Sequence, residues 1–315
     1  MNIGGKSNGF GRLILPTRRQ DNQRIRLDGG QNPAASNTCL TSIIGRPERV
    51  IRDRNIGRYG RTIVVLMNLK RRIPLLRWSV LRLATGNRNF TTTGQVGDGR
   101  EAAVVDYVLQ NARAGDIDDV IATIDKFAYK KSILVNVGDE KGQLLDAAVR
   151  RADPALVLEL GTYCGYGALR IARAAPNAKV FSVELAEANA ANARQIWAHA
   201  GVADRVTCVV GTIGDGGRTL DVLADQHGFG SGALDFVFLD HDKDAYLNDL
   251  QSILNRGWLH PGSITVADNV GFPGAPKYRE YMRQQQGMLW KTIEHKAHAE
   301  YQSLMPDLVL ESVYL

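Results

Sequence analysis

Acidic residues at the ends of predicted strands are the side chains most able to do chemistry in this chain. Glu159, Glu184, Asp240 and Asp268 each close or nearly close a short apolar run, and Asn269 follows the last of them. In an open α/β sheet, ligands bind outside the carboxyl ends of the strands, so we expect these side chains to gather at one edge. Crowded carboxylates repel one another unless a cation or hydrogen-bond donors neutralise them. The oxygens of Asp240, Asp268 and Asn269 are hard ligands that suit magnesium.

Each of these residues also has a purely structural interpretation. An Asp-Asn pair after a strand is more often a turn than a pair of ligands. Glu184 could be a solvated strand end, and Lys243, in the run DHDKDAY, could be an exposed charge. The adjacency of the predicted strand ends favours the functional interpretation for the Asp-Asn pair.

A glycine-rich turn follows the first predicted strand, in the segment LELGTYCGYG. Such a turn lets a ligand approach the backbone and presents free N–H groups at the start of a helix. Gly161, Gly165 and Gly167 have the spacing G-x-x-x-G-x-G, which departs from the dinucleotide fingerprint and disfavours NAD. Glu184, which ends the next strand, is placed to accept two hydrogen bonds from a ribose diol.

Alternation of apolar runs and helical stretches predicts the fold class. Five short runs read as buried strands, and two β-rich runs without an intervening helix form the tail. The pattern predicts an α/β protein with a doubly wound, mostly parallel, seven-stranded sheet and an antiparallel edge. The predicted strands are 155–160, 179–184, 205–210, 234–240, 263–268, 289–294 and 307–315, and helices are predicted over 101–112, 115–131 and 138–152.

The charge divides the chain into a basic arm and an acidic body. Residues 1–96 carry 18 Lys and Arg against 4 Asp and Glu, or +14, which leaves −8 for residues 97–315 of the total of +6. We expect a largely disordered arm over 1–61 and an amphipathic basic segment over 62–96. Its part 62–83 fits either a helix on an anionic membrane surface or a helix packed on the body or on a second copy in a homodimer. Met67 offers an alternative translation start.

Composition indicates a cytoplasmic globular enzyme. With 315 residues, 44% of them hydrophobic, the chain can bury a large core without disulfides or structural metal. Its three cysteines are widely spaced and fit no zinc-ligand pattern. No apolar run has the length of a signal peptide or of a membrane span.

Five separated motifs make residues 97–315 resemble the catechol O-methyltransferase family. They match that family in order and spacing, and the likeness implies a Rossmann-like methyltransferase fold with S-adenosylmethionine and Mg²⁺ as cofactors. The motifs are VNVGDEKG (135–142), LVLELGTYCGYGALRIAR (156–173), VFLDHDKDAYL (237–247), ADNVGFPGAP (267–276) and AEYQS (299–303).

The resemblance implies a role for each matching residue. Asp240, Asp268 and Asn269 match the metal ligands, Lys243 the general base, and Glu300 the carboxylate that holds the second hydroxyl of a vicinal diol. Lys141 and Pro273 match residues that line the substrate site. The matches to cofactor contacts are Val137, Glu159, Gly161, Tyr163, Gly167, Glu184, Asp240 and His241.

The implied reaction is methyl transfer to a hydroxyl of a small phenolic molecule. Chelation of two adjacent phenolic oxygens lowers the pKa of the one to be methylated, and a lysine base then removes its proton. The chain departs from the family at Asp242, where a tryptophan is expected, at Gly167, at Ile213-Gly214, and at Ile133, where the aromatic gate of a catechol site is expected.

Two other functions compete with this one. The basic arm could deliver the same domain to RNA, with a hydroxylated base as acceptor, although no aromatic-basic RNA module supports nucleic-acid binding. A non-enzymatic cofactor-binding scaffold would have no need of Lys243 beside the metal ligands. A phenol other than catechol is the remaining alternative acceptor.

Overall fold

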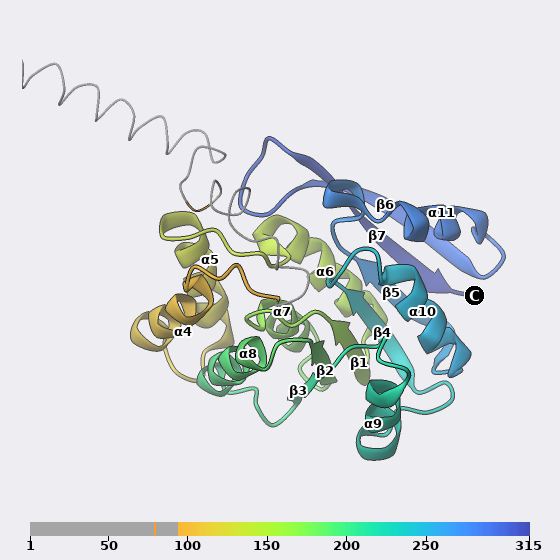
Figure 1. Cartoon of the computed structure of the whole chain (residues 1–315), viewed down its shortest axis with the longest axis horizontal. Coiled ribbons are helices and arrows are strands. Elements are labelled where there is room, and N and C mark those ends of the chain that lie inside the picture. Colours follow the sequence, from red (N-terminus) through yellow and green to blue (C-terminus); the bar gives the residue numbers. More distant parts are fainter. Residues whose placement is uncertain (1–78, 80–93) are drawn as a thin grey trace, which may run out of the picture. The chain divides into compact units, whose positions relative to one another are not determined.

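The computed structural model describes Ser79 and residues 94–315, which form a seven-stranded mixed sheet (Figure 1). The strand order is β3-β2-β1-β4-β5-β7-β6, and β7 alone runs antiparallel to its neighbours. The strands are β1 (Leu156–Leu160), β2 (Lys179–Glu184), β3 (Val206–Val210), β4 (Leu234–Leu239), β5 (Leu259–Ala267), β6 (Trp290–His298) and β7 (Pro306–Tyr314).

Successive side chains of the central strands point to opposite faces, and both faces are buried. Val157 and Phe236 join one hydrophobic cluster, whereas Leu158 and Val237 join the other. A parallel strand covered on both faces needs apolar residues at consecutive positions rather than at alternate ones. The apolar stretches 156–158 and 236–239 meet this requirement.

Two layers of helices cover the sheet (Figure 1). The layer on one face is made of helices α4 to α8, and the layer on the other face is made of α9, α10 and α11. Their bounds are α4 (Arg100–Asn111), α5 (Ile117–Lys130), α6 (Gly138–Ala152), α7 (Tyr166–Ala174), α8 (Glu187–Ala200), α9 (Arg218–His227), α10 (Tyr246–Asn255) and α11 (Pro276–Gln284).

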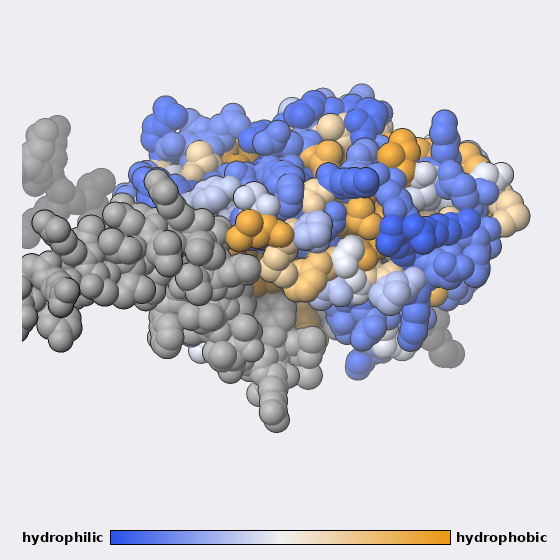
Figure 2. Space-filling view, turned by 90° about the horizontal axis from the view of Figure 1, so that it is seen from above, coloured by the Kyte–Doolittle hydropathy of each residue, from blue (hydrophilic) through white to orange (hydrophobic). Residues whose placement is uncertain are grey.

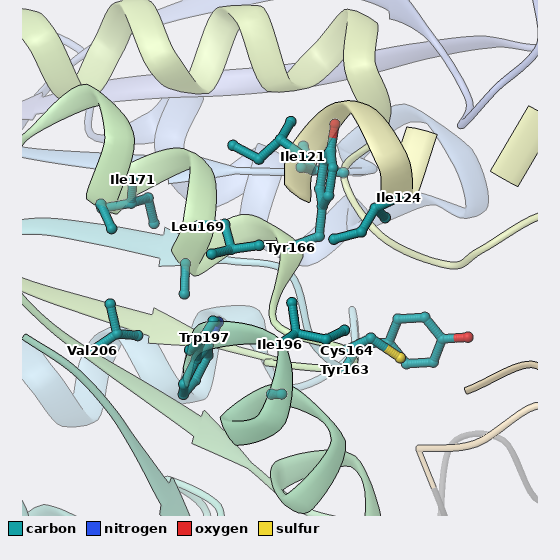
Figure 3. Packing of buried hydrophobic residues seen from close by; sticks show 14 of the residues in the cluster. Ile121, Ile124, Tyr163, Cys164, Tyr166, Leu169, Ile171, Ile196, Trp197 and Val206 are labelled. Atoms are coloured by element: carbon teal, nitrogen blue, oxygen red, sulfur yellow. The ribbon is translucent and has the colours of Figure 1, made fainter. Parts of the chain in front are cut away.

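The first layer packs around helix α7. Figure 3 shows Tyr166 of α7 between Ile121 and Ile124 of α5, while the ring of Tyr163 lies at the edge of the cluster. The Tyr166 hydroxyl donates to Asp125 Oδ1 at 2.7 Å, so this buried phenol keeps a hydrogen-bond partner. Helix α5 begins at Ile117, because the Asp116 side chain caps it by accepting from the Asp119 N–H.

The structure confirms the predicted fold class. All seven predicted strands are present, including the antiparallel edge formed by β7 between β5 and β6. The predictions for residues 1–61, for the membrane or dimer contact of 62–83 and for a start at Met67 lie outside the described residues, apart from Ser79. In the described part of the chain, no helix has the length and apolarity needed to cross a membrane.

Gly161 allows the ends of β1 and β4 to lie against each other. Its φ is +98°, and a Cβ at this position would lie 2.4 Å from the backbone oxygen of Asp240. Backbone atoms cannot move aside as a flexible side chain can, so only glycine fits here. The same contact brings the glycine-rich turn next to the loop that carries Asp240.

We predict that Gly161→Ala lowers the free energy of unfolding by about 3 kcal/mol or more, because left-handed strain and backbone overlap add together. Gly228→Ala is the matched control, since Gly228 has φ +78° but no atom within 4 Å of the added Cβ. It should cost about 1–2 kcal/mol. Equilibrium unfolding in urea measures both, and equal losses would show that the close approach to Asp240 is not a constraint.

Candidate active site

A cavity of about 630 Å³ opens at the carboxyl ends of the parallel strands. Gly161 and Tyr163 line one part of it, and Lys243, Asn269 and Glu300 line another. Seen from above, the described residues show hydrophobic side chains among hydrophilic ones toward the centre of the visible face (Figure 2). The cavity therefore combines a glycine-rich turn with a group of charged side chains, as the strand-end pattern predicts.

The predicted metal trio comes from two neighbouring strand ends. Asp240 follows β4 and its N–H donates to Leu160 O at 2.9 Å, while Asp268 follows β5 and its N–H donates to Leu239 O at 2.9 Å. These bonds continue the parallel ladder past the ends of the strands. They bring Asp240, Asp268 and Asn269 to the same edge of the sheet.

Asp268 is the most constrained of the three. Its side chain is fully buried, and neither carboxylate oxygen accepts a hydrogen bond from the described residues. Lys141 Nζ lies 2.9 Å from Oδ1, which gives charge compensation without the geometry of a hydrogen bond. Burial raises the pKa of Asp268, and Lys141 opposes that rise. A buried carboxylate with unused lone pairs is the condition that a bound cation would relieve.

The Asn269 side chain has a fixed orientation. Its Nδ2 donates to Glu300 Oε1 at 2.7 Å and to Asp307 Oδ2 at 2.9 Å. Ionised carboxylates only accept hydrogen bonds, so the amide nitrogen must face them and Oδ1 must point elsewhere. The amide oxygen of Asn269 is thus available as a ligand.

These three residues fit a magnesium ion. Within the part of the chain that the structure describes, no three His, Cys, Asp or Glu side chains are grouped as a metal site. Two carboxylates and an amide oxygen remain as the candidate donor set, and the orphaned oxygens of Asp268 favour it. Such oxygen donors suit Mg²⁺, with water and substrate in the other positions.

Lys141 is a buried cation surrounded by acids. Its side chain is 1% exposed, and Nζ lies 2.6 Å from Glu300 Oε1 and 2.9 Å from Asp307 Oδ2, in addition to Asp268. Burial alone would lower the pKa of Lys141, but the three carboxylates raise it well above its usual value. Predicted as a lining residue, Lys141 instead lies behind the cavity wall.

Lys243 lies on the cavity wall next to the trio. Its Nζ donates to Asp240 Oδ1 at 3.0 Å and to Tyr246 Oη at 2.7 Å. Tyr246 is fully buried, and its hydroxyl lies 2.8 Å from Leu239 O and 3.1 Å from Asp268 O. Tyr246 therefore holds the ammonium group at a fixed position relative to both strand ends.

His241 is oriented by a neighbouring acid. Its Nε2 lies 2.8 Å from Asp249 Oδ2, and its ring stacks on Tyr246 with centroids 5.0 Å apart. Its buried Nδ1 has no hydrogen-bond partner among the described residues. Both His241 and Asp249 line the cavity.

Glu184 is already bound by backbone groups. Oε2 accepts from Tyr163 N at 2.8 Å and from Thr162 N at 3.2 Å, and Oε1 accepts from Ala186 N at 2.9 Å. Burial raises the pKa of Glu184, and these N–H donors oppose the rise. The carboxylate lies in the cavity wall beside the glycine-rich turn, and Oε1 also accepts from Asn189 Nδ2 at 3.3 Å, so each of its two oxygens already accepts two hydrogen bonds.

Glu159 occupies the space beside Gly167. A Cβ on Gly167 would lie 2.2 Å from Glu159 Oε1, and Glu159 Oε2 accepts a short hydrogen bond from Ser182 Oγ. Burial raises the pKa of Glu159 to about 8 against the opposing effect of Ser182. Glu159 and Gly167 lie behind the cavity wall, so the structure places them next to the cavity but not in it.

The remaining predicted residues flank the cavity. Tyr163 and Pro273 line it, whereas Val137 is 2% exposed and lies behind the wall. Asp307 and Tyr246 are contacts of the site that the sequence reasoning missed. Asp307 stands at the start of an apolar run, and Tyr246 stands in a helical pattern. Neither position indicates a role in the site.

Comparisons with known proteins find relatives of this chain. A family model described as O-methyltransferase matches residues 111–298. A probable O-methyltransferase of Mycobacterium tuberculosis is 80% identical over 233 residues, which are 74% of this chain and 100% of that protein. Catechol O-methyltransferase B of Danio rerio is 40% identical over 217 residues, 69% of this chain and 79% of that protein.

A solved structure shares the fold. It is the O-methyltransferase TomG of Streptomyces achromogenes, involved in tomaymycin synthesis and solved in complex with SAM. The match has a TM-score of 0.50 and 22% sequence identity, and it covers 68% of this chain and 96% of that chain.

The raised pKa of Glu159 predicts a pH dependence of stability. Glu159 keeps its proton in the folded chain up to about pH 8, whereas the unfolded chain loses it near the ordinary value of 4.5. Unfolding then releases a proton between these two values, so stability falls as pH rises, by up to about 1.4 kcal/mol per pH unit from this group.

Glu159→Gln removes this contribution and keeps a partner for Ser182. Urea unfolding of the metal-free and cofactor-free protein at pH 5, 6, 7 and 8 should show a smaller loss of stability with pH in Glu159→Gln than in the wild type. Parallel pH profiles for the two proteins would contradict the raised pKa.

Proposed function

Because the chain belongs to the S-adenosylmethionine-dependent O-methyltransferase family, we propose that it methylates one of two adjacent hydroxyls on a catechol-like small molecule held by Mg²⁺. The observation that carries the proposal is the fully buried Asp268 carboxylate. Neither of its oxygens accepts a hydrogen bond from the described residues, and Asp268 directly precedes Asn269, which lines the cavity together with Asp240. A methyl transfer without a metal would leave this costly carboxylate without a purpose.

The metal site and the acceptor site share one wall of the cavity. When bound, Mg²⁺ would lower the pKa of a coordinated phenolic hydroxyl and fix its position. Glu300 Oε1 is held by Asn269 Nδ2 and Lys141 Nζ, and the Glu300 side chain is 18% exposed. The other carboxylate oxygen can therefore accept a hydrogen bond from the second hydroxyl. A vicinal diol is the group that uses both features.

We assign the proton transfer to Lys243. Its Nζ lies 3.0 Å from Asp240 Oδ1 and lines the cavity, within reach of a hydroxyl bound beside Asp240. A cation on Asp240 would compete with Lys243 for that carboxylate and so favour release of Nζ toward the acceptor. Tyr246 keeps Nζ in place while its partner changes. The neutral amine form of Lys243 would accept the proton of the hydroxyl and become an ammonium. General base catalysis by a positioned side chain contributes roughly 10²–10⁴-fold.

The cofactor is assigned to the other half of the cavity. Gly161 and Tyr163 offer a close backbone approach, and a ribose diol beside Glu184 would replace donors that the carboxylate now accepts, such as Asn189 Nδ2 at 3.3 Å. His241, held by Asp249, would border the adenine. This arrangement would place a bound cofactor next to the acceptor hydroxyl, and alignment of the two would supply most of the rate enhancement.

The wall around the acceptor differs from an aromatic catechol cage. Ile133 and the exposed Asp242 line it, and Phe272 on the turn Val270–Gly274 is 46% exposed at its mouth. An open wall of this kind also fits a larger phenol, which is the alternative acceptor.

We predict that the purified chain transfers a methyl group from S-adenosylmethionine to a vicinal diphenol when Mg²⁺ is present. Chelation should abolish transfer and leave cofactor binding intact, because the metal trio and the glycine-rich turn are separate parts of the cavity. A panel of catechols, larger diphenols and monophenols, followed by mass spectrometry of the products, measures acceptor class and methylated position.

Two variants control this experiment. Lys243→Gln should lower kcat by roughly 10²–10⁴-fold with little change in cofactor affinity, whereas the exposed Lys179→Gln should match the wild type. Transfer that persists in the chelator would contradict the metal role. Cofactor binding without transfer to any diphenol would contradict the acceptor class.

A further inference from the structure

We propose that Asp307 is a positioning residue for the metal site, an inference that rests on the proposed function. Asp307 lies near the start of β7, and its side chain is fully buried. Oδ1 accepts from three backbone N–H groups, and Oδ2 accepts from two side chains. Five donors on one carboxylate make it a junction between the β7 strand, the turn Val270–Gly274 and the metal trio.

The first consequence concerns the direction of the Asn269 amide. Asp307 Oδ2 accepts from Asn269 Nδ2 at 2.9 Å. Glu300 also accepts from this nitrogen, but Glu300 is partly exposed and is expected to exchange partners when an acceptor binds. Asp307 is fully buried and does not face the cavity, so it can hold the nitrogen throughout a reaction. The amide oxygen then stays directed away from Asp307, as a ligand for the metal.

The second consequence concerns the turn that follows the trio. Asp307 Oδ1 accepts from Gly271 N at 3.1 Å and from Phe272 N at 2.8 Å. A Cβ on Gly271 would lie 2.8 Å from Leu308 N, so the turn is packed directly on β7. Asp307 thereby links the direction of Asn269 to the placement of Phe272 at the cavity mouth.

The third consequence concerns charge. Lys141 Nζ lies 2.9 Å from Asp307 Oδ2 and 2.9 Å from Asp268 Oδ1. A cation that binds Asp268 would repel this ammonium, and Asp307 offers Lys141 a buried partner that does not belong to the metal trio. Asp307 thus allows Asp268 to exchange the ammonium for a metal without leaving Lys141 unpaired.

The test exchanges the two polar groups. In Asp307→Asn, the new amide keeps an oxygen for Gly271 and Phe272, but its nitrogen faces the donors Lys141 and Asn269. In Asn269→Asp, a carboxylate faces Asp307 and Glu300. We expect each variant to weaken Mn²⁺ binding by roughly 10–100-fold, as loss of an outer hydrogen bond to a metal ligand does. Electron paramagnetic resonance of the full chain measures free and bound Mn²⁺ without any turnover.

Asn269→Asp makes the test independent of how well Asp307→Asn folds. An added carboxylate in the ligand set should tighten Mn²⁺ binding if Asp307 has no orienting role, whereas the proposal requires weaker binding. The double variant Asn269→Asp/Asp307→Asn restores a donor opposite an acceptor. The double variant should bind Mn²⁺ at least about tenfold more tightly than either single variant, as expected for residues in direct contact.

Glu311→Gln is the matched control, because Glu311 is a buried carboxylate on the same strand that pairs with Arg151 away from the cavity. It should bind Mn²⁺ as the wild type does, and S-adenosylmethionine affinity by calorimetry should be unchanged in every variant. Wild-type Mn²⁺ affinity in folded Asp307→Asn, or tighter binding in Asn269→Asp, would overturn the inference. A wild-type chain that binds no Mn²⁺ would instead overturn the proposed metal site, and this role with it.

Discussion

Buried carboxylates around one ammonium group are the interaction on which this site depends. Asp240, Asp268, Glu300 and Asp307 come together at one edge of the sheet, and Lys141 is in ion-pair contact with the last three. Removing such charges from water is costly, and removal of one partner leaves the others uncompensated. The excess of acid over base leaves Asp268 short of donors, which is why we propose that this edge accepts a divalent cation. The same excess of negative charge would explain both the carboxylate without hydrogen bonds and the proposed affinity for metal.

The topology of the sheet explains how these groups meet. Parallel strands β4 and β5 end side by side and present Asp240 and Asp268. The antiparallel strand β7 pairs with β5 in the opposite direction, so Asp307 near its start lies beside the end of β5. Helix α6 begins at the same edge and delivers Lys141 from its first turn. The antiparallel edge is therefore part of the chemistry as well as of the fold.

Much of this arrangement could be predicted from the sequence. Apolar runs depend on neighbouring residues alone, so the seven strands and the helix that contains residues 117–130 could be predicted from local patterns. Because the carboxyl ends of parallel strands converge, the sequence also predicts that Asp240 and Asp268 lie close together. The expectation that Glu184 serves a ribose remains a proposal, and no sequence pattern indicates that backbone N–H groups of Thr162 and Tyr163 already bind it.

The rest could not be predicted, because it depends on contacts between distant parts of the chain. Lys141 and Asp307 are 166 residues apart, and the residues around each of them do not indicate that the two side chains meet. Tyr246 occupies an ordinary apolar position of a helix, and its hydroxyl acquires a role only when α10 places it against two strand ends. Residues of this kind hold other side chains of the site in place, so their types and their spacing in the sequence do not indicate a functional role.

The central claim is that Asp240, Asp268 and Asn269 hold a metal ion beside the cofactor. Anomalous scattering from crystals grown with Mn²⁺ and S-adenosylmethionine tests it directly. The account predicts one peak roughly 2.2 Å from a carboxylate oxygen of Asp240, a carboxylate oxygen of Asp268 and Oδ1 of Asn269. A cofactor-bound crystal with no peak at this edge, and with Lys141 still the only cation beside Asp268, would contradict it.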